Sequence, residues 1–401
     1  MKRISNRLLV FILTVGVFGI LNTEMGIVGV IPYVSERYGV SIPDAGFLVS
    51  GFALIIAVAG PTMPLLFSRV NRKLVMLLSL GIFTVCNALA IVAPTYEALL
   101  AFRVIPAAFH PLYVSLAMSI AQVSGDTPQQ CAKASAQVFV GVSAGMVVGA
   151  PIAGLLASCI AFPAAMAFFA VVTAFAFVLT AVLVPSIPVS TRMSYGKQIA
   201  VLKKPLFVVS LLAAATVNAG MFGFYSYLAD YLGAVGFAAV AVSGLLFAYG
   251  LMNVVGNVIA GRALGKRPGV TMVVAPALLI VLYGALFIEG IRLSGGVCLI
   301  AVGAVLIVLG IVVGVANTTD QYLVSRAAPE APDFANGLFL TATNVGTTIG
   351  TSICGVLIDS ASTLSAVVGA LPCVIIGIGF ILARLRLQHA QASFNGKQAK
   401  E

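Results

Sequence analysis

The stretches GVSAGMVVGAPIAG (141–154) and ATNVGTTIGTSICG (342–355) decide the fold, because one pattern is written twice. Three glycines of the first recur in the second, each displaced by 201 residues: Gly145 as Gly346, Gly149 as Gly350, and Gly154 as Gly355. Two further pairs of segments echo each other at a similar distance: AGFLVSGFAL (45–54) with SGLLFAYGL (243–251), and LLFSRVNRK (65–73) with VIAGRALGKR (258–267). A repeat near 200 residues predicts two similar halves.

The composition places both halves in a lipid bilayer. Of the 401 residues, 61% are hydrophobic and only 8% are charged, whereas soluble domains carry about 25% charged residues. Apolar stretches of about 20 residues are long enough to cross the hydrocarbon layer as helices. We expect an all-α membrane protein with twelve transmembrane helices in two pseudo-symmetric bundles of six. The predicted spans are 8–31, 45–67, 74–93, 97–121, 132–157, 163–184, 206–231, 238–261, 270–289, 295–319, 334–358 and 363–384.

The net charge is +10, and the positions of the basic residues along the chain indicate the membrane topology. Most basic residues fall at the termini and at alternate loops, and the other loops hold little more than Arg37 and Arg292. The bias of Lys and Arg toward the cytoplasm predicts two cytoplasmic termini and an even number of spans. A nucleic-acid partner is therefore not expected. The residues assigned to the cytoplasmic side are Lys2, Arg3, Arg7, Arg69, Arg72, Lys73, Lys133, Arg192, Lys197, Lys203, Lys204, Arg262, Lys266, Arg267, Arg326, Arg384, Arg386, Lys397 and Lys400.

The polar and basic segment 185–205 divides the chain. We expect an N-terminal six-helix bundle (1–184), this segment as a cytoplasmic linker with a short amphipathic helix, a C-terminal bundle (206–384) and a cytoplasmic tail (385–401). Two similar bundles are typical of transporters that hold substrate at the membrane midplane and expose it alternately to each side.

Small residues and short basic turns are the candidates for moving parts. Glycines four residues apart line one helix face and let a neighbouring backbone approach closely, and Pro151 loosens the local hydrogen bonds. Gly145, Gly149, Pro151 and Gly154 thus indicate either ordinary packing or a hinge. The turns SRVNRK (68–73) and GRALGKR (261–267) set topology, and Arg69, Arg72 and Arg262 would also act as a gate if they reach helix ends or acids. Asp320, six residues before Arg326, is expected to be a helix-end or gate contact.

Charged residues inside spans are the candidates for chemistry. Glu24 lies in ILNTEMGIVGVIP (20–32), where an ionised side chain costs several kcal/mol unless it is paired, hydrated or protonated. From helix rise, Glu24 and Arg103 lie about 10 Å and about 9 Å below the outer face. His110 follows about two turns after Arg103, on the same helix face. It either extends a binding site inward or forms a hydrogen bond where Pro111 breaks the helix.

The chain resembles the major facilitator superfamily, specifically the twelve-span drug:proton antiporter branch that also contains sugar and nucleoside exporters. PLLFSRVNRK (64–73) is similar to the loop 2–3 motif G-x-L-A-D-R-x-G-R-[RK] at Leu66, Arg69, Arg72 and Lys73, and departs from it at Pro64, Ser68 and Asn71. Residues 141–154 resemble the fifth-span antiporter motif, which implies export. NTEMGIVGVIP (22–32) resembles a first-span pattern that carries an acid. RVIPAAFHP (103–111) resembles the fourth-span motif, with Ala107 where glycine is common.

The resemblance implies that the first and fourth spans line a central cavity, in which Glu24 and Arg103 face each other. Glu24 is then either a proton carrier that competes with substrate or one partner of a permanent ion pair with Arg103. Aromatic side chains suit planar or amphipathic ligands. The aromatic residues of the seventh span are therefore expected to line the substrate-binding site, with core packing as the alternative. The candidate substrate-binding residues are Phe18, Asn22, Glu24, Arg103, His110, Asn218, Phe222, Tyr225 and Asn344.

The expected function is export of a small drug-like or amphipathic molecule across a bacterial inner membrane, driven by inward proton flow. Exporters of sugars, nucleosides or other metabolites, and a passive facilitator, remain alternatives. The sequence has two histidines and no metal-ligand or nucleophile–base spacing, so we expect no enzyme, no metal and no cofactor beyond the proton gradient. It has no G-x-x-x-x-G-K-[ST] loop, which excludes a P-loop ATP site. The expected partners are substrate, protons and the bilayer, and we expect a monomer.

Overall fold

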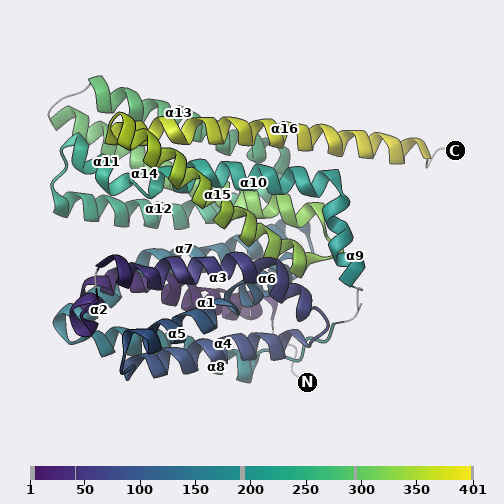
Figure 1. Cartoon of the computed structure of the whole chain (residues 1–401). Coiled ribbons are helices and arrows are strands. Elements are labelled where there is room, and N and C mark those ends of the chain that lie inside the picture. Colours follow the sequence, from purple (N-terminus) through teal and green to yellow (C-terminus); the bar gives the residue numbers. More distant parts are fainter. Residues whose placement is uncertain (1–4, 41, 190–194, 293–295, 399–401) are drawn as a thin grey trace. The chain divides into compact units, whose positions relative to one another are not determined.

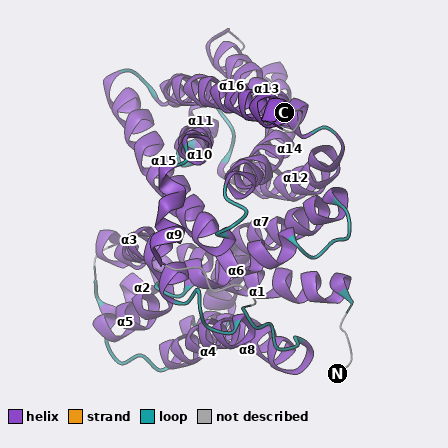
Figure 2. Ribbon diagram, turned by 90° about the vertical axis from the view of Figure 1, so that its right-hand side faces the viewer, coloured by secondary structure: helices purple, strands orange, loops and turns teal. Residues whose placement is uncertain are grey.

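The structure, a computed structural model, describes residues 5–40, 42–189, 195–292 and 296–398. Helices account for nearly all of this part of the chain, and it contains no strand (Figure 2). Eleven of its helices are long and apolar enough to cross a membrane. The protein is therefore a multi-pass membrane protein built from helices, as the sequence predicts.

The predicted span 334–358 is the one that falls short on hydropathy. It forms helix α15 (Pro332–Ser360), whose 29 residues include many threonines and glycines along with three polar residues, Asp333, Asn336 and Asn344. These residues lower the apolar content of α15 below that of the eleven other helices. A count of twelve spans and the cytoplasmic placement of the termini stay predictions.

The helices fall into two compact units (Figure 1). Unit 1 runs to Gln198 and adds Ala331–Thr341, and unit 2 comprises Ile199–Glu330 and the chain from Ala342 onward. Unit 1 holds α1 (Asn6–Gly26), η1 (Ile27–Val30), α2 (Ile31–Tyr38), α3 (Ile42–Leu66), α4 (Arg72–Ile91), α5 (Tyr96–Ala107), α6 (His110–Gln122), α7 (Pro128–Cys159), α8 (Phe162–Leu183) and most of α9 (Tyr195–Ile199). Unit 2 holds η2 (Ala200–Lys203), α10 (Pro205–Tyr225), α11 (Leu228–Val235), α12 (Ala239–Lys266), α13 (Pro268–Arg292), α14 (Gly296–Ala327), most of α15, η3 (Thr363–Ser365) and α16 (Ala366–Gln398).

The start of α15 groups with unit 1, whereas the sequence repeat assigns it to the C-terminal bundle. Its contacts explain the difference. Asp333 pairs with Arg72 of α4, and the Thr341 hydroxyl donates to the Ala57 carbonyl at 3.4 Å. A Cβ added at Gly337 would lie 2.2 Å from the carbonyl oxygen of Gly60 on α3. Polar bonds and a close backbone approach thus hold the first three turns of α15 to unit 1.

The predicted linker contains the short helices α9 and η2. Gln198 on α9 donates a hydrogen bond of 2.9 Å to the Ser68 hydroxyl in the turn between α3 and α4. Residues 190–194, with Arg192, lie outside the described residues, as do Lys2, Arg3 and Lys400.

The repeated glycines make equivalent contacts in the two halves. A Cβ added at Gly149 of α7 would lie 2.9 Å from the side-chain oxygen of Asn22 on α1. One added at Gly350 of α15 would lie 1.9 Å from the carbonyl oxygen of Ala219 on α10. Helix α7 continues through Pro151. The glycines therefore serve close packing of the fifth span on the first in each half, and a hinge at Pro151 stays a prediction.

The first span of each half ends in the same way. Helix α1 gives way to η1 and the short α2, which ends at Gly39 with φ 64°. Helix α10 gives way to the short α11, which ends at Gly236 with φ 111°. Both glycines adopt the left-handed conformation that terminates a helix and that other residues disfavour. The repeat thus extends to local backbone geometry.

The fourth predicted span is interrupted. Helix α5 ends at Ala107 and α6 begins at His110, and the N–H of Phe109 bonds the carbonyl of Pro106 at 2.9 Å. Pro111 has no N–H, and its ring clashes with the carbonyl four residues earlier, at Ala107. The break therefore follows from Pro111, and it places His110 at the first position of a new helix.

Candidate functional site

Glu24 and His110 form a close pair inside unit 1. Oε2 of Glu24, on the last turn of α1, lies 2.9 Å from Nε2 of His110, on the first turn of α6. Glu24 is 8% exposed and His110 is 4% exposed. These two atoms lie at ion-pair distance, although neither makes a hydrogen bond within the described chain. The structure therefore places a histidine against the buried carboxyl.

Arg103 lies beside this pair but bonds the backbone. Its guanidinium donates to the carbonyls of Thr23 at 2.7 Å and Glu24 at 3.2 Å. Helix α1 ends at Gly26, and carbonyls in a last turn have no partner within their own helix. Arg103 thus caps the C-terminus of α1. The expected ion pair between this guanidinium and the Glu24 carboxylate is not formed, and the carboxylate lies beside His110 instead.

Phe52 of α3 completes the surroundings. The Arg103 guanidinium carbon lies 5.1 Å from the centre of the Phe52 ring, and the His110 ring meets the same phenyl edge-on at 6.1 Å. A cation over an aromatic face is stabilised by the charge distribution of the ring. The sequence prediction missed Phe52, because one aromatic in an apolar span reads equally well as core packing.

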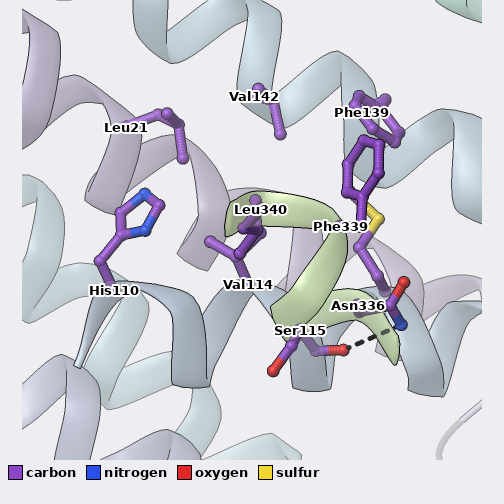
Figure 3. Close-up of a pocket in the computed structure, with 10 residues that line it drawn as sticks. Leu21, His110, Val114, Ser115, Phe139, Val142, Asn336, Phe339 and Leu340 are labelled. Atoms are coloured by element: carbon purple, nitrogen blue, oxygen red, sulfur yellow. Dashed lines mark hydrogen bonds between the residues drawn. The ribbon is translucent and has the colours of Figure 1, made fainter. Parts of the chain in front are cut away.

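Several polar atoms near this pair have no hydrogen-bond partner among the described residues. They are the side-chain nitrogen and oxygen of Asn22, Nε of Arg103, Oε2 of Glu24 and both ring nitrogens of His110. Buried polar groups are normally paired, and unpaired ones call for an unseen water or ligand. His110 also lines a cavity of about 60 Å³ with Leu21, Val114, Phe139 and residues of α15 (Figure 3). This space fits a few water molecules and is smaller than the 300–1,000 Å³ typical of ligand pockets.

The other candidate substrate residues fall in both units. In unit 1, Phe18 is half-buried on α1, near the buried Asn22. In unit 2, Asn218 accepts a hydrogen bond of 2.8 Å from Thr347, and Asn344 is half-buried on α15.

Aromatic residues predicted on the seventh span contact one another and a ring of α12 in unit 2. The rings of Phe222 and Tyr225 meet edge-on at 6.1 Å. Tyr225 is 38% exposed and stacks on Tyr249 of α12 at 5.4 Å. This geometry satisfies both the binding and the packing interpretation, since one face of Tyr225 is packed and part of the side chain is open.

The basic turn before α4 meets an acid that the sequence prediction missed. Arg72 pairs with Asp333 at 3.3 Å, and the Ser119 hydroxyl of α6 donates to the same carboxylate. The family motif carries its aspartate at the position of Ser68, so the carboxylate here comes from α15 instead. The sequence feature that could have identified this residue was an acidic side chain just before the predicted span 334–358.

The remaining candidate gate residues are placed differently. Arg69 lies 4.5 Å from the ring centre of Tyr195 on α9, and Arg262 is exposed near the end of α12. Asp320 is 2% exposed within α14, and its Oδ2 has no hydrogen-bond partner among the described residues. Asp320 therefore lies inside unit 2 and makes no contact of the expected helix-end kind through this oxygen.

The Arg72–Asp333 pair gives a pH-dependent prediction. Burial raises the pKa of Asp333, although Arg72 and the Ser119 hydroxyl lower it. With its pKa raised, the folded protein binds this proton more tightly than the unfolded chain. The contribution to stability is therefore greatest below the ordinary pKa and is lost as pH rises through the raised one. We expect Arg72→Gln to lower stability by about 1–3 kcal/mol near neutral pH and by less near pH 4, because a raised pKa favours the protonated carboxyl as pH falls.

Thermal unfolding in detergent at the two pH values measures this effect. Arg69→Gln is the control, because that guanidinium meets a tyrosine ring instead of an acid. Asp333→Asn removes the buried charge and should cost less than Arg72→Gln near neutral pH. Equal losses for Arg72→Gln at both pH values would contradict the prediction.

Comparisons with known proteins agree with this architecture. Residues 13–351 match the family model described as Major Facilitator Superfamily. The inner membrane transport protein YdhP of Escherichia coli (strain K12) is 27% identical over 372 residues, which cover 92% of this chain and 93% of YdhP. The MFS-type transporter YtbD of Bacillus subtilis is 28% identical over 357 residues, covering 87% of this chain and 88% of that protein. A probable sugar efflux transporter of Helicobacter acinonychis is 24% identical over 339 residues, covering 84% and 85%.

A solved structure shares the fold. The crystal structure of the human organic anion transporter MFSD10 matches with a TM-score of 0.72 and 16% identity, covering 96% of this chain and all of that chain. At this identity the likeness concerns the fold alone. With the family model matching most of the chain, and with eleven membrane-crossing helices described, the protein belongs to the Major Facilitator Superfamily and is a multi-pass membrane transporter.

Proposed function

We propose that the protein is a proton-coupled exporter of a small organic, drug-like or amphipathic molecule in a bacterial inner membrane, working by alternating access. The proton gradient is its energy source, and it needs no bound cofactor. The observation that carries this proposal is the buried Glu24–His110 pair, at 2.9 Å, beside unpaired polar atoms and a small cavity. Intramembrane acids that meet histidines are typical of proton relays.

The Glu24–His110 pair couples proton movement to substrate transport. A proton that enters from the outside occupies the carboxyl, and His110 accepts or returns it across the short contact. Arg103 stays bonded to the carbonyls of α1, so it keeps a positive charge near the pair without neutralising the carboxyl directly. Protonation of Glu24 lowers affinity for substrate on the outside, and loss of the proton on the inside restores it. The basic turn at Arg72, with Asp333, is proposed to stabilise one state of the cycle.

A sugar exporter is the second candidate. It is favoured by the likeness to the probable sugar efflux transporter of Helicobacter acinonychis. The unpaired amide of Asn22 suits hydroxyl groups, whereas the open face of Tyr225 suits planar ligands. Identifying the chemical class of the substrate distinguishes the drug-like exporter from the sugar exporter.

Transport in proteoliposomes tests the proposal. With an acidic lumen, an antiporter exchanges internal protons for external substrate, so substrate should accumulate above its external concentration. A panel of dyes, antibiotics, sugars and nucleosides identifies the class, and a protonophore should abolish accumulation while leaving equilibration intact. Equilibration that is unaffected by the gradient would instead show a passive facilitator.

A further inference from the structure

Unit 2 contains a large cavity that the proposed transport site does not use. It measures about 630 Å³ and lies among the starts of α10 and α13, the end of α14 and the middle of α16. Leu206, Met272 and Leu385 give it apolar walls, and Arg326, Arg384 and Gln388 contribute polar groups. Its volume is in the range of ligand pockets.

The guanidinium of Arg384 has only neutral partners. Arg384 is 2% exposed, and it donates to the Ser210 hydroxyl at 3.0 Å, the Gln388 side-chain oxygen at 3.1 Å and the Leu323 carbonyl at 3.4 Å. Among the described residues, no carboxylate lies within 4 Å of it. A buried cation without a counter-charge is costly. Its fixed position and uncompensated charge favour binding of an anion in the adjoining cavity.

A second arginine lines the same cavity. Arg326 is exposed at the end of α14, with its guanidinium carbon 5.4 Å from the ring centre of Tyr322. Within the described chain, it too has no carboxylate within 4 Å. Two guanidinium groups on one cavity are suited to a phosphate, which accepts several charge-assisted hydrogen bonds.

The residues around this cavity are also positively charged. The same end of unit 2 carries Lys203, Lys204, Lys266, Arg267 and Arg386 at the termini of η2, α10, α12 and α13 and on α16. Glu330, just after α14, is already engaged by Lys204. From the sequence we expect this end to face the cytoplasm, where membrane surfaces carry anionic lipids.

We propose that this cavity binds one anionic phospholipid, with its phosphate between Arg326 and Arg384 and an acyl chain along Leu206, Met272 and Leu385. A free phosphate would satisfy the arginines but would leave the apolar walls uncovered, and it fills only a small part of about 630 Å³. A phospholipid would contact the arginines with its phosphate and the apolar walls with its acyl chain. Basic pockets between membrane helices on the cytoplasmic side bind lipid head groups in this way.

Native mass spectrometry of the detergent-purified full chain tests the site. The probes are phosphatidylglycerol, phosphatidylcholine and inorganic phosphate, and the variants are Arg326→Gln and Arg386→Gln. Arg386 is exposed on α16 but does not line the cavity, so the control loses the same charge nearby. We expect tighter binding of phosphatidylglycerol than of phosphatidylcholine and a loss of about tenfold in Arg326→Gln. Arg386→Gln should match the wild type.

Three results would overturn the proposal. Equal binding of the two lipids would remove the requirement for an anion. Equal losses in the two variants would show general attraction to a basic surface. Displacement of the lipid by millimolar phosphate would show a site for free anions. Neither variant lies at Glu24 or His110, and binding is measured without transport, so failure here leaves the proposed function intact and the reverse also holds.

Discussion

Glu24→Gln is expected to abolish proton-driven accumulation of substrate. Glutamine keeps the size and a hydrogen-bonding oxygen near His110, but it cannot bind and release a proton in the transport cycle. One pH unit corresponds to about 1.4 kcal/mol. A gradient of two units can therefore drive up to about 100-fold accumulation for one proton per substrate, and the variant should lose all of it.

The measurement compares two modes of transport in the same proteoliposomes. Exchange of labelled for unlabelled substrate across the membrane needs no net proton movement, so Glu24→Gln should retain it, with a raised KM because a neutral side chain at this position lowers substrate affinity, while losing accumulation. The matched control is Glu97→Gln, an identical change at an exposed position at the start of α5, and it should behave as the wild type.

Two outcomes would contradict the proton-carrier role of Glu24. Unchanged accumulation would show that Glu24 is not the coupling group. Loss of both modes in a variant that remains folded would favour a structural role for the Glu24–His110 pair. The second outcome corresponds to the structural interpretation that the sequence left open, with His110 in place of Arg103 as the partner.

Gly350→Ala is expected to have the largest effect on stability. The added methyl would lie 1.9 Å from the carbonyl oxygen and 2.6 Å from the carbonyl carbon of Ala219. Both are backbone atoms of α10, so helix α15 must shift as a whole. Overpacking in well-packed interiors typically costs 1–3 kcal/mol. Because rigid backbone is involved, we expect about 3 kcal/mol or more and a Tm lower by about 5 °C or more.

A thiol-reactive dye follows this unfolding. The chain has no tryptophan, whereas Cys354, one turn after Gly350 on α15, is buried. In a background where the exposed Cys159 and the half-buried Cys131 are replaced by serine, its thiol is expected to react when the protein unfolds. Gly284→Ala is the control, since nothing lies within 4 Å of a Cβ built there. Alanine is the better helix former, so this variant should be as stable as the wild type or slightly more so. Equal melting of the two variants would show that α15 does not approach α10 this closely.

The sequence predicted the helical, multi-pass character of the protein because the relevant signals are local and repeated. Lengths of apolar residues predict helices, and glycines four residues apart predict where a neighbouring backbone approaches. The structure confirms helical spans throughout the described chain, and the glycine pairs Gly149 and Gly350 meet the first helix of their own half.

Local sequence signals could not predict which groups the charged side chains contact, because these contacts depend on how each helix is oriented in the fold. The position of Arg103 and Glu24 at similar depth predicted a contact. It did not reveal that the guanidinium would take carbonyls freed at the end of α1, leaving the carboxyl to His110. Asp333 was missed for a related reason: it is distant in sequence from Arg72, and nothing short of the fold brings α15 to α4.

The interruption between α5 and α6 has no counterpart in the equivalent helix of the second half, as far as the structure describes it. There the corresponding fourth span is α14, an unbroken helix of 32 residues. The two halves of the repeat therefore differ at this position: the first carries His110 where the helix is interrupted, and the second carries a continuous helix. Moving His110 and its neighbouring prolines into α14 would test whether these residues alone are enough to interrupt the equivalent helix of the second half.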